Sequence, residues 1–307
     1  MKINRTIFAS RSEEKVFKSL ESKWSPQFKL LPALPLSVLF KLEANDVTKS
    51  EGQYFYSTSV DYTLCDSADQ PLLSIEFDGI GGGFSKNGVY IPGHRSLDPM
   101  RKVKLDFKLS CAAKVDYPFF VVSYDEAESI DQDDTLMILD AVIGQVLARK
   151  EFLRKINELA DEYDTGLAEA TSLENHELKQ IALEDMLTSC EVESELKMDP
   201  VARKAAEYSG LCLGLGVGSY SLSYLSDPAL PGLSGIEDIE GLKARIEAMK
   251  LTVREGCRII IDMPNQNIEK TVWVRNFESY GVSSYSIARN IAEYLGFKKA
   301  YSLLPKM

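Results

Sequence analysis

Two runs near the start of the chain decide its fold: VDYTL at residues 60–64 and PLLSIEFDG at residues 71–79. Both are predicted to be β-strands, joined by the turn-forming DSADQ at residues 66–70. Each strand carries an acidic residue, Asp61 in the first and Glu76 in the second. Because Glu76 stands between two apolar residues, its strand is expected to lie inside a sheet, where an unpaired carboxylate is costly. A divalent cation is the partner that converging carboxylates suit best.

Helices and strands are predicted on both sides of these two strands. An acidic first turn and an apolar stripe predict a helix over residues 10–23. The Asp98-Pro99 pair is a strong helix start, and a basic helix is predicted from there to residue 114. The apolar run at 119–123 predicts a further strand, and a long helix follows over 133–163. This order predicts an α/β protein, specifically a three-layer α/β/α fold with a mixed central sheet.

The division of the chain follows from a change in composition after this long helix. We expect a core domain over residues 1–160 and an acidic, helical insertion over residues 161–255. Residues 256–307 are predicted to form a strand-helix tail that could rejoin the core sheet.

Bulk composition excludes several classes of protein. The 307 residues are 45% hydrophobic, which is enough for a sizeable core, and the net charge is −11. That charge argues against a broad nucleic-acid-coating surface but leaves room for a local basic groove. The two histidines are too few for a zinc site or a convincing triad. The chain begins without an apolar signal core and has no long apolar run, so we expect a cytoplasmic protein with no membrane partner.

Five cysteines, at positions 65, 111, 190, 212 and 257, are scattered along the chain without a CxxC pair. They are expected to be buried thiols in a reducing compartment.

The order strand with Asp61, strand with Glu-x-Asp, then basic helix resembles the PD-(D/E)XK, or restriction-endonuclease-like, nuclease superfamily. The most similar group is the bacterial domain-of-unknown-function branch near the very-short-patch-repair endonucleases. The resemblance covers roughly residues 10–125, and it includes an N-terminal helix with Glu14 and the strand at 118–122. Its order and spacing are moderately specific.

The resemblance implies a metal-dependent nuclease. Asp61 would be the central ligand of Mg²⁺ or Mn²⁺, with Glu76 as the second ligand and the backbone carbonyl of Phe77 as the third. Glu14 would be an outer or second-metal ligand, and Asp78 lies close enough in sequence to join the set. The family's lysine normally stands two residues after Glu76.

The chain departs from the family at that lysine, because the position holds Asp78. Some members carry the lysine on the following helix, and Lys108 is the candidate here. Arg101 and Lys104 share a helix face with Lys108 and would contact phosphates.

Each of these residues also has a structural interpretation. Asp61 could be an exposed carboxylate at a strand edge, and Glu76 could form a salt bridge to Lys104 or Lys108. Asp78 could simply open a turn, and Glu14 suits the helix dipole. The bases of residues 101–108 could be an ordinary solvated helix face.

Three functions therefore stay open. The first is a metal-dependent nuclease that hydrolyses phosphodiester bonds, of DNA more than RNA, in repair or defence. The second is a catalytically inactive protein of the same fold that binds nucleic acid or a protein partner. The third is a scaffold whose helical insertion forms a homodimer or recruits a protein. Metal binding through Asp61 and Glu76 separates the first two, whereas the scaffold predicts that removing residues 165–255 abolishes activity and leaves the core folded.

Overall fold

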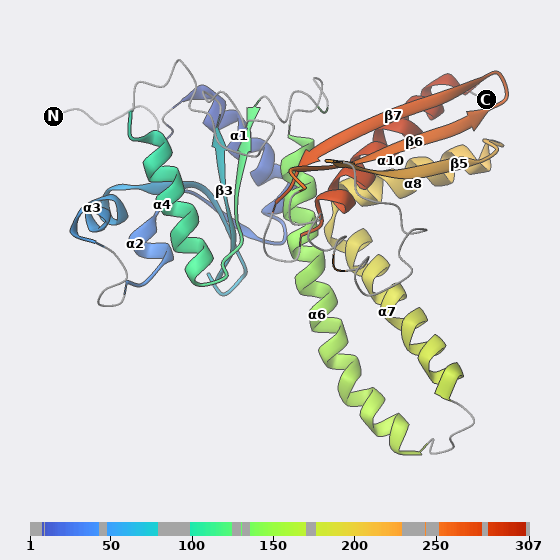
Figure 1. The fold of residues 1–307 in the computed structure, drawn as a ribbon, viewed down its shortest axis with the longest axis horizontal. Coiled ribbons are helices and arrows are strands. Elements are labelled where there is room, and N and C mark those ends of the chain that lie inside the picture. The colour runs from blue at the N-terminus through green and yellow to red at the C-terminus, as the bar shows by residue number, and fades with distance from the viewer. Residues whose placement is uncertain are drawn as a thin grey trace. The chain divides into compact units, whose positions relative to one another are not determined.

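The computed structural model describes residues 8, 10–42, 48–78, 99–124, 130, 136–169, 176–228, 243, 252–277 and 282–304. The Gly-rich segment at residues 79–93 is outside these residues. The chain divides into two compact units (Figure 1). Unit 1 comprises residues 1–136 and 277–280, and unit 2 comprises residues 137–276 and 281–307. The division falls at residue 136, earlier than the predicted boundary at residue 160.

Unit 1 contains a mixed four-stranded sheet in the order β1-β2-β3-β4. Its strands are β1 (Lys29–Pro35), β2 (Ser59–Cys65), β3 (Pro71–Asp78) and β4 (Phe119–Ser123). β1 and β2 pair antiparallel, as do β2 and β3, whereas β4 runs parallel to β3. A parallel neighbour requires a crossover connection, and the helix α4 (Arg101–Lys114) lies in that connection. The predicted α/β class with a mixed sheet is thus confirmed.

Helices lie on both faces of this sheet. The first helix, α1 (Arg11–Trp24), begins where Ser10 accepts a hydrogen bond from the amide of Glu13. Its backbone also accepts a hydrogen bond from the hydroxyl of Tyr62, so α1 covers the face to which Tyr62 points. Side chains alternate along a strand, and α4 contacts Glu76 on the opposite face. Two short helices, α2 (Leu36–Leu39) and α3 (Lys49–Ser57), also belong to unit 1.

The hydrophobic core beside α4 fixes this helix on the sheet. Leu105, Phe107, Cys111 and Ala112 of α4 cluster with apolar residues of α2, α3, β2 and β4. Burying large side chains of this kind contributes about 1.5–3 kcal/mol each. The cluster therefore holds the neighbouring polar face of α4 in a defined position over β3.

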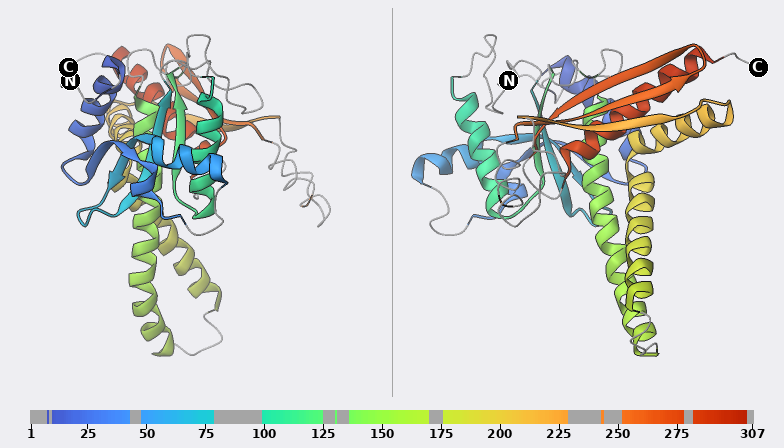
Figure 2. Two further views of the ribbon diagram at one scale, coloured as in Figure 1. Left: turned by 90° about the vertical axis from the view of Figure 1, so that its left-hand side faces the viewer. Right: turned by 45° about the vertical axis from the view of Figure 1, so that its right-hand side comes forward.

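Unit 2 combines a long helical hairpin with a second sheet. The hairpin consists of α6 (Met137–Glu169) and α7 (His176–Met198), which run side by side (Figure 2). α8 (Pro200–Gly214) and α10 (Ser284–Leu303) pack against each other. The sheet contains β5 (Tyr220–Asp227), β6 (Arg254–Met263) and β7 (Gln266–Arg275), all antiparallel.

The last third of the chain differs from the prediction in two respects. The predicted helical insertion contains a strand, β5, and the strands of the tail pair with β5 in a separate sheet. All five cysteines are buried and free of disulfides, as their surroundings predicted. Within the described part of the chain, no helix is both long and apolar enough to cross a membrane.

The net negative charge is concentrated in the hairpin segment. Residues 158–195 contain twelve of the 46 acidic residues and one of the 35 basic residues. This segment alone accounts for the chain's formal charge of −11, and acidic and basic residues balance elsewhere. Unit 1 itself is net acidic, with 16 basic and 21 acidic residues, so contact with nucleic acid there would need a local basic surface.

Candidate functional site

One face of the sheet in unit 1 carries a row of polar side chains beneath α4. On β3, Ser74, Glu76 and Asp78 alternate with the buried apolar residues Ile75 and Phe77. The register that pairs Tyr62 with Ile75 places Asp61 opposite Glu76 one step further along. Because opposite residues of an antiparallel pair point to the same face, the two predicted metal ligands come together.

Asp61 is a partly buried carboxylate in a setting that disfavours its charge. Its Oδ2 accepts a hydrogen bond from the amide of Phe77 at 2.9 Å. Burial, followed by the negative charge of Glu76, raises the pKa of Asp61 well above its usual value. The positive charge of Lys108 and the Phe77 amide oppose this shift. The free protein therefore holds Asp61 in a position where a cation would be favourable.

Glu76 is bound on one side only. Its Oε1 lies 2.6 Å from Nζ of Lys108, and both side chains are at least five-sixths buried. Its Oε2 is buried and has no hydrogen-bond partner among the residues that the structure describes. Such an atom loses its hydration without compensation, which costs about 1–3 kcal/mol or more for a charged group. The arrangement includes the predicted Glu76–Lys108 salt bridge but does not satisfy the carboxylate.

Asp78 and Arg101 form a second ion pair on the same face. Asp78 is 2% exposed, and its Oδ1 accepts a hydrogen bond from Nη2 of Arg101 at 2.5 Å. α4 thus presents Arg101 to Asp78 and, two turns later, Lys108 to Glu76. Asp78, predicted as a metal ligand, is therefore paired with an arginine. Arg101, predicted to bind phosphate, already contacts a carboxylate.

Two predicted site residues remain, Glu14 on α1 and Lys104 on α4. Glu14 forms an exposed ion pair with Lys18 at 2.7 Å. The negative charge of Glu13, on the same helix, contributes to the raised pKa of Asp61. Lys104 lies on α4 between Arg101 and Lys108 and is partly exposed. The described residues include no group of three or more His, Cys, Asp or Glu side chains placed to hold a metal.

Sequence reasoning missed a buried hydroxyl network beside the acidic pair. Thr63 and Ser74 are fully buried, and their hydroxyl oxygens lie 2.9 Å apart. The hydroxyl of Tyr117 lies 3.0 Å from that of Ser74. The alternation of polar residues at 61 and 63 and at 74, 76 and 78 was the signal that could have identified one polar face.

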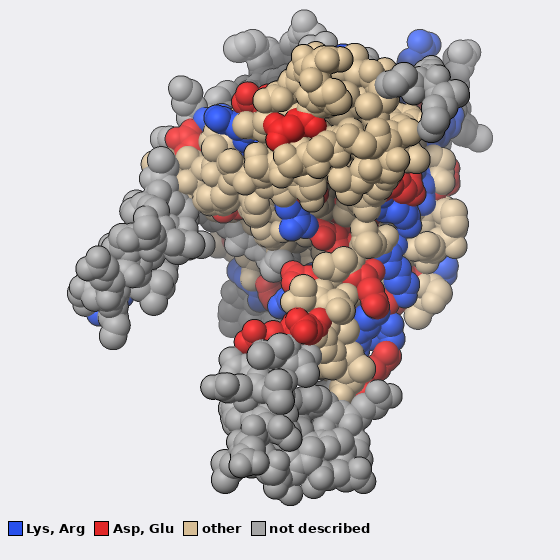
Figure 3. All heavy atoms as spheres, turned by 90° about the vertical axis from the view of Figure 1, so that its right-hand side faces the viewer, with Lys and Arg blue, Asp and Glu red and all other residues tan. Residues whose placement is uncertain are grey.

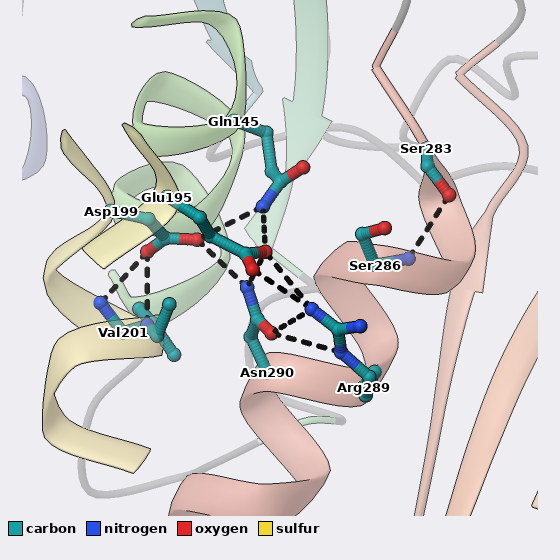
Figure 4. Close-up of polar contacts among 9 residues, drawn as sticks. Gln145, Glu195, Asp199, Val201, Ser283, Ser286, Arg289 and Asn290 are labelled. Carbon is teal, nitrogen blue, oxygen red and sulfur yellow. Dashed lines mark hydrogen bonds and ion pairs between the residues drawn. The ribbon is translucent and has the colours of Figure 1, made fainter. Parts of the chain in front are cut away.

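A second polar cluster lies in unit 2, among residues of α6, α7 and α10 and the start of α8 (Figure 4). We call it the helix clasp: Gln145 of α6, Glu195 of α7, Asp199 before α8, and Arg289 and Asn290 of α10. The amide of Asn290 donates to Glu195 at 2.8 Å and to Asp199 at 3.1 Å. Gln145 donates to Glu195 at 2.8 Å, and Arg289 donates to Oε2 of Glu195 at 2.9 Å.

The helix clasp is satisfied internally. Asp199 is fully buried, and its Oδ1 caps α8 by accepting from the amides of Val201 and Ala202. Burial nevertheless raises the pKa of Asp199 to about 6. Because every carboxylate here has hydrogen-bond donors, the clasp fits a structural role, in contrast to the half-satisfied Glu76.

A scan against protein-family models, a search of curated proteins and a search of solved structures each found no match.

Proposed function

We propose that unit 1 binds a divalent cation, Mg²⁺ or Mn²⁺, through Asp61 and Glu76 and hydrolyses phosphodiester bonds of DNA. The observation that carries this proposal is the meeting of two carboxylates across adjacent strands. One has a raised pKa, and the other has a buried oxygen without a hydrogen-bond partner. Such a pair weakens the sheet, whereas a bound cation would neutralise both charges.

The topology of unit 1 is compatible with the restriction-endonuclease-like fold. Two antiparallel pairs lead into β3, and a helical crossover returns to the parallel strand β4. The acidic residues lie on the two central strands, and the bases lie on the helix that covers them.

The residues around the pair suit this chemistry. Bound to the two carboxylates, a cation would polarise a phosphate and activate a water molecule. The Phe77 amide orients Asp61, and Lys108 orients Glu76, so neither carboxylate must reorganise. Lys104, on the same face of α4, would meet a phosphate of the substrate.

One observation favours a second function, nucleic-acid or protein binding without cleavage. Asp78 occupies the position of the motif lysine and is held by Arg101. A site in which Lys108 is already bound to Glu76 could retain the cation and lack the group that assists the attacking water.

Cleavage of labelled single- and double-stranded DNA and RNA, with Mg²⁺ or Mn²⁺ and with chelator, tests the proposal. We expect cleavage by the wild type and loss of cleavage in Asp61→Asn and in Glu76→Gln. The control is Asp106→Asn, an exposed carboxylate on α4 paired with Lys102, which should cleave normally. Calorimetric titration with Mn²⁺ separates the alternatives. Binding without cleavage supports the inactive function, and a wild type that shows no binding and no cleavage refutes a metal site.

A further inference from the structure

The ammonium of Lys108 acts on both carboxylates of the acidic pair in unit 1. Its Nζ lies 2.6 Å from Oε1 of Glu76. Its positive charge also opposes the upward shift of the Asp61 pKa, so it lies within electrostatic range of that carboxylate as well. The two negative groups therefore share the ammonium of Lys108 as a common counter-charge.

The position of Lys108 keeps its charge inside the site. The Lys108 side chain is 8% exposed, and its neighbours Phe107 and Cys111 belong to the hydrophobic core that holds α4 over β3. Acidic and basic side chains also lie next to one another on the exposed surface, as on the face seen in Figure 3, where water screens their charges. At a buried position, both the attraction of opposite charges and the repulsion of like charges are stronger. The charge of Lys108 therefore opposes any second cation that approaches the pair.

The formal charges of these three groups show what a divalent cation would meet. Ionised Asp61 and Glu76, together with Lys108, have one negative charge in excess. Addition of Mg²⁺ or Mn²⁺ would leave one positive charge in excess at a buried site, which is unfavourable. A phosphodiester carries one negative charge and would restore neutrality. A cation together with a phosphate therefore suits the site better than a cation alone.

Lys108 is also able to contact a phosphate. An ammonium has three donors, and within the described residues Nζ donates one hydrogen bond, to Glu76. Lysine carries its charge on a flexible four-carbon stem, so Nζ can turn from one acceptor to another without movement of α4. The oxygens of a phosphodiester are strong acceptors for a charged donor of this kind. Lys108 can thus exchange Glu76 for a phosphate.

We propose that Lys108 is a resident counter-ion that opposes cation binding in the free protein, and that a phosphodiester releases Glu76 to the cation by accepting the ammonium. This inference rests on the proposed metal site and adds to it how the site is regulated. The free protein binds its cation weakly, and bound DNA strengthens that binding. A purely structural salt bridge predicts the reverse, because its loss disorders Glu76 and weakens cation binding.

Calorimetric titration of the full chain with Mn²⁺ at pH 8, without nucleic acid, tests the opposing charge. We expect Lys108→Met to bind Mn²⁺ about tenfold more tightly than the wild type, because the repulsion is removed. The matched control is Lys102→Met, which removes the same charge from α4 at a pair with Asp106 that is about half exposed. This control should bind Mn²⁺ as the wild type does. Lys108→Arg, which keeps the charge, should bind Mn²⁺ no more tightly than the wild type.

The affinity for a DNA duplex, with and without Mn²⁺, tests the exchange of partners. A fluorescein-labelled duplex with phosphorothioate linkages keeps the backbone charge and resists cleavage, and its anisotropy reports binding. Because coupling between two ligands is reciprocal, Mn²⁺ strengthens duplex binding by the same factor as the duplex strengthens Mn²⁺ binding. We expect this factor to be about tenfold larger for the wild type than for Lys108→Met. Lys102→Met should match the wild type.

Each outcome decides between the regulated site and the simpler alternatives. A Lys108→Met protein that binds Mn²⁺ no more tightly than the wild type overturns this inference and leaves the proposed metal site standing. Equal coupling factors in the two proteins overturn the exchange of partners. If Lys108→Met does not fold, the wild type still decides, because strengthening of duplex binding by Mn²⁺ of less than about tenfold contradicts the coupling. A wild type that binds neither Mn²⁺ nor the duplex refutes the proposed function and this inference together.

Discussion

The ammonium of Lys108 lies 2.6 Å from Oε1 of Glu76, while the second oxygen of the same carboxylate is buried with no hydrogen-bond partner in the described part of the chain. One oxygen of the Glu76 carboxylate is therefore paired and the other is not. Asp61 lies on the neighbouring strand, where burial and then the negative charge of Glu76 raise its pKa. Stability alone would favour a neutral or apolar residue at one of these positions, and this conflict is typical of a binding site.

Two ion pairs on α4 have the same length but different burial, which allows a matched test. Lys108–Glu76 is largely buried, whereas Lys102–Asp106 is about half exposed, and both distances are 2.6 Å. We expect Lys108→Met to lower the free energy of unfolding by about 3–5 kcal/mol, because it leaves a buried charge unpaired. Lys102→Met should cost less than about 1 kcal/mol. Urea denaturation measures both, and equal effects would contradict the burial of the Glu76 pair.

Removing the charge of Asp61 should stabilise the metal-free protein. An asparagine side chain at this position would keep an oxygen for the Phe77 amide and would end the repulsion from Glu76. We expect Asp61→Asn to raise the free energy of unfolding in chelator at pH 7 by about 1 kcal/mol. Denaturation with excess Mg²⁺ should reverse the order, because only the wild type gains from the cation. A variant less stable than the wild type in chelator would argue for a purely structural Asp61.

The buried Asp199 should make stability depend on pH. Burial raises its pKa from 3.8 to about 6 in the folded protein. Between these values the folded state binds the proton and the unfolded state does not, so stability falls as pH rises from about 4 to about 6. The total loss is about 3 kcal/mol. The difference in unfolding free energy between the wild type and Asp199→Asn, followed over this range, isolates the effect. A constant difference would contradict it.

Gly144 on α6 is required by the close approach of Asp199. A Cβ at this position would lie 2.6 Å from Cα of Asp199, a backbone atom that cannot move freely. Gly144→Ala should therefore destabilise the protein by about 1–3 kcal/mol. Gly210→Ala is the control, because a Cβ there meets nothing within 4 Å on α8. Its free energy of unfolding should rise by about 0.5–1 kcal/mol because alanine has the higher helix propensity, as measured by thermal or urea unfolding. A Gly144→Ala protein as stable as the control would refute the close contact.

Local patterns in the sequence determined much of unit 1. The apolar runs predicted β2, β3 and β4, and the helix predicted from residue 99 to 114 is α4 at Arg101–Lys114. These local patterns also predicted that Asp61 and Glu76 lie on neighbouring strands. These features depend on residues within a few positions of each other, which is why sequence periodicity and turn chemistry reveal them.

Only the tertiary structure decided which side chains meet. Strand register sets Asp61 opposite Glu76, and the packing of α4 selects Lys108 for Glu76 and Arg101 for Asp78. The pairing of β5 with β6 and the contact of Asn290 with Asp199 join residues far apart in the chain. Such partners are chosen by long-range packing and by the need to satisfy buried polar groups, and neither leaves a local pattern in the sequence.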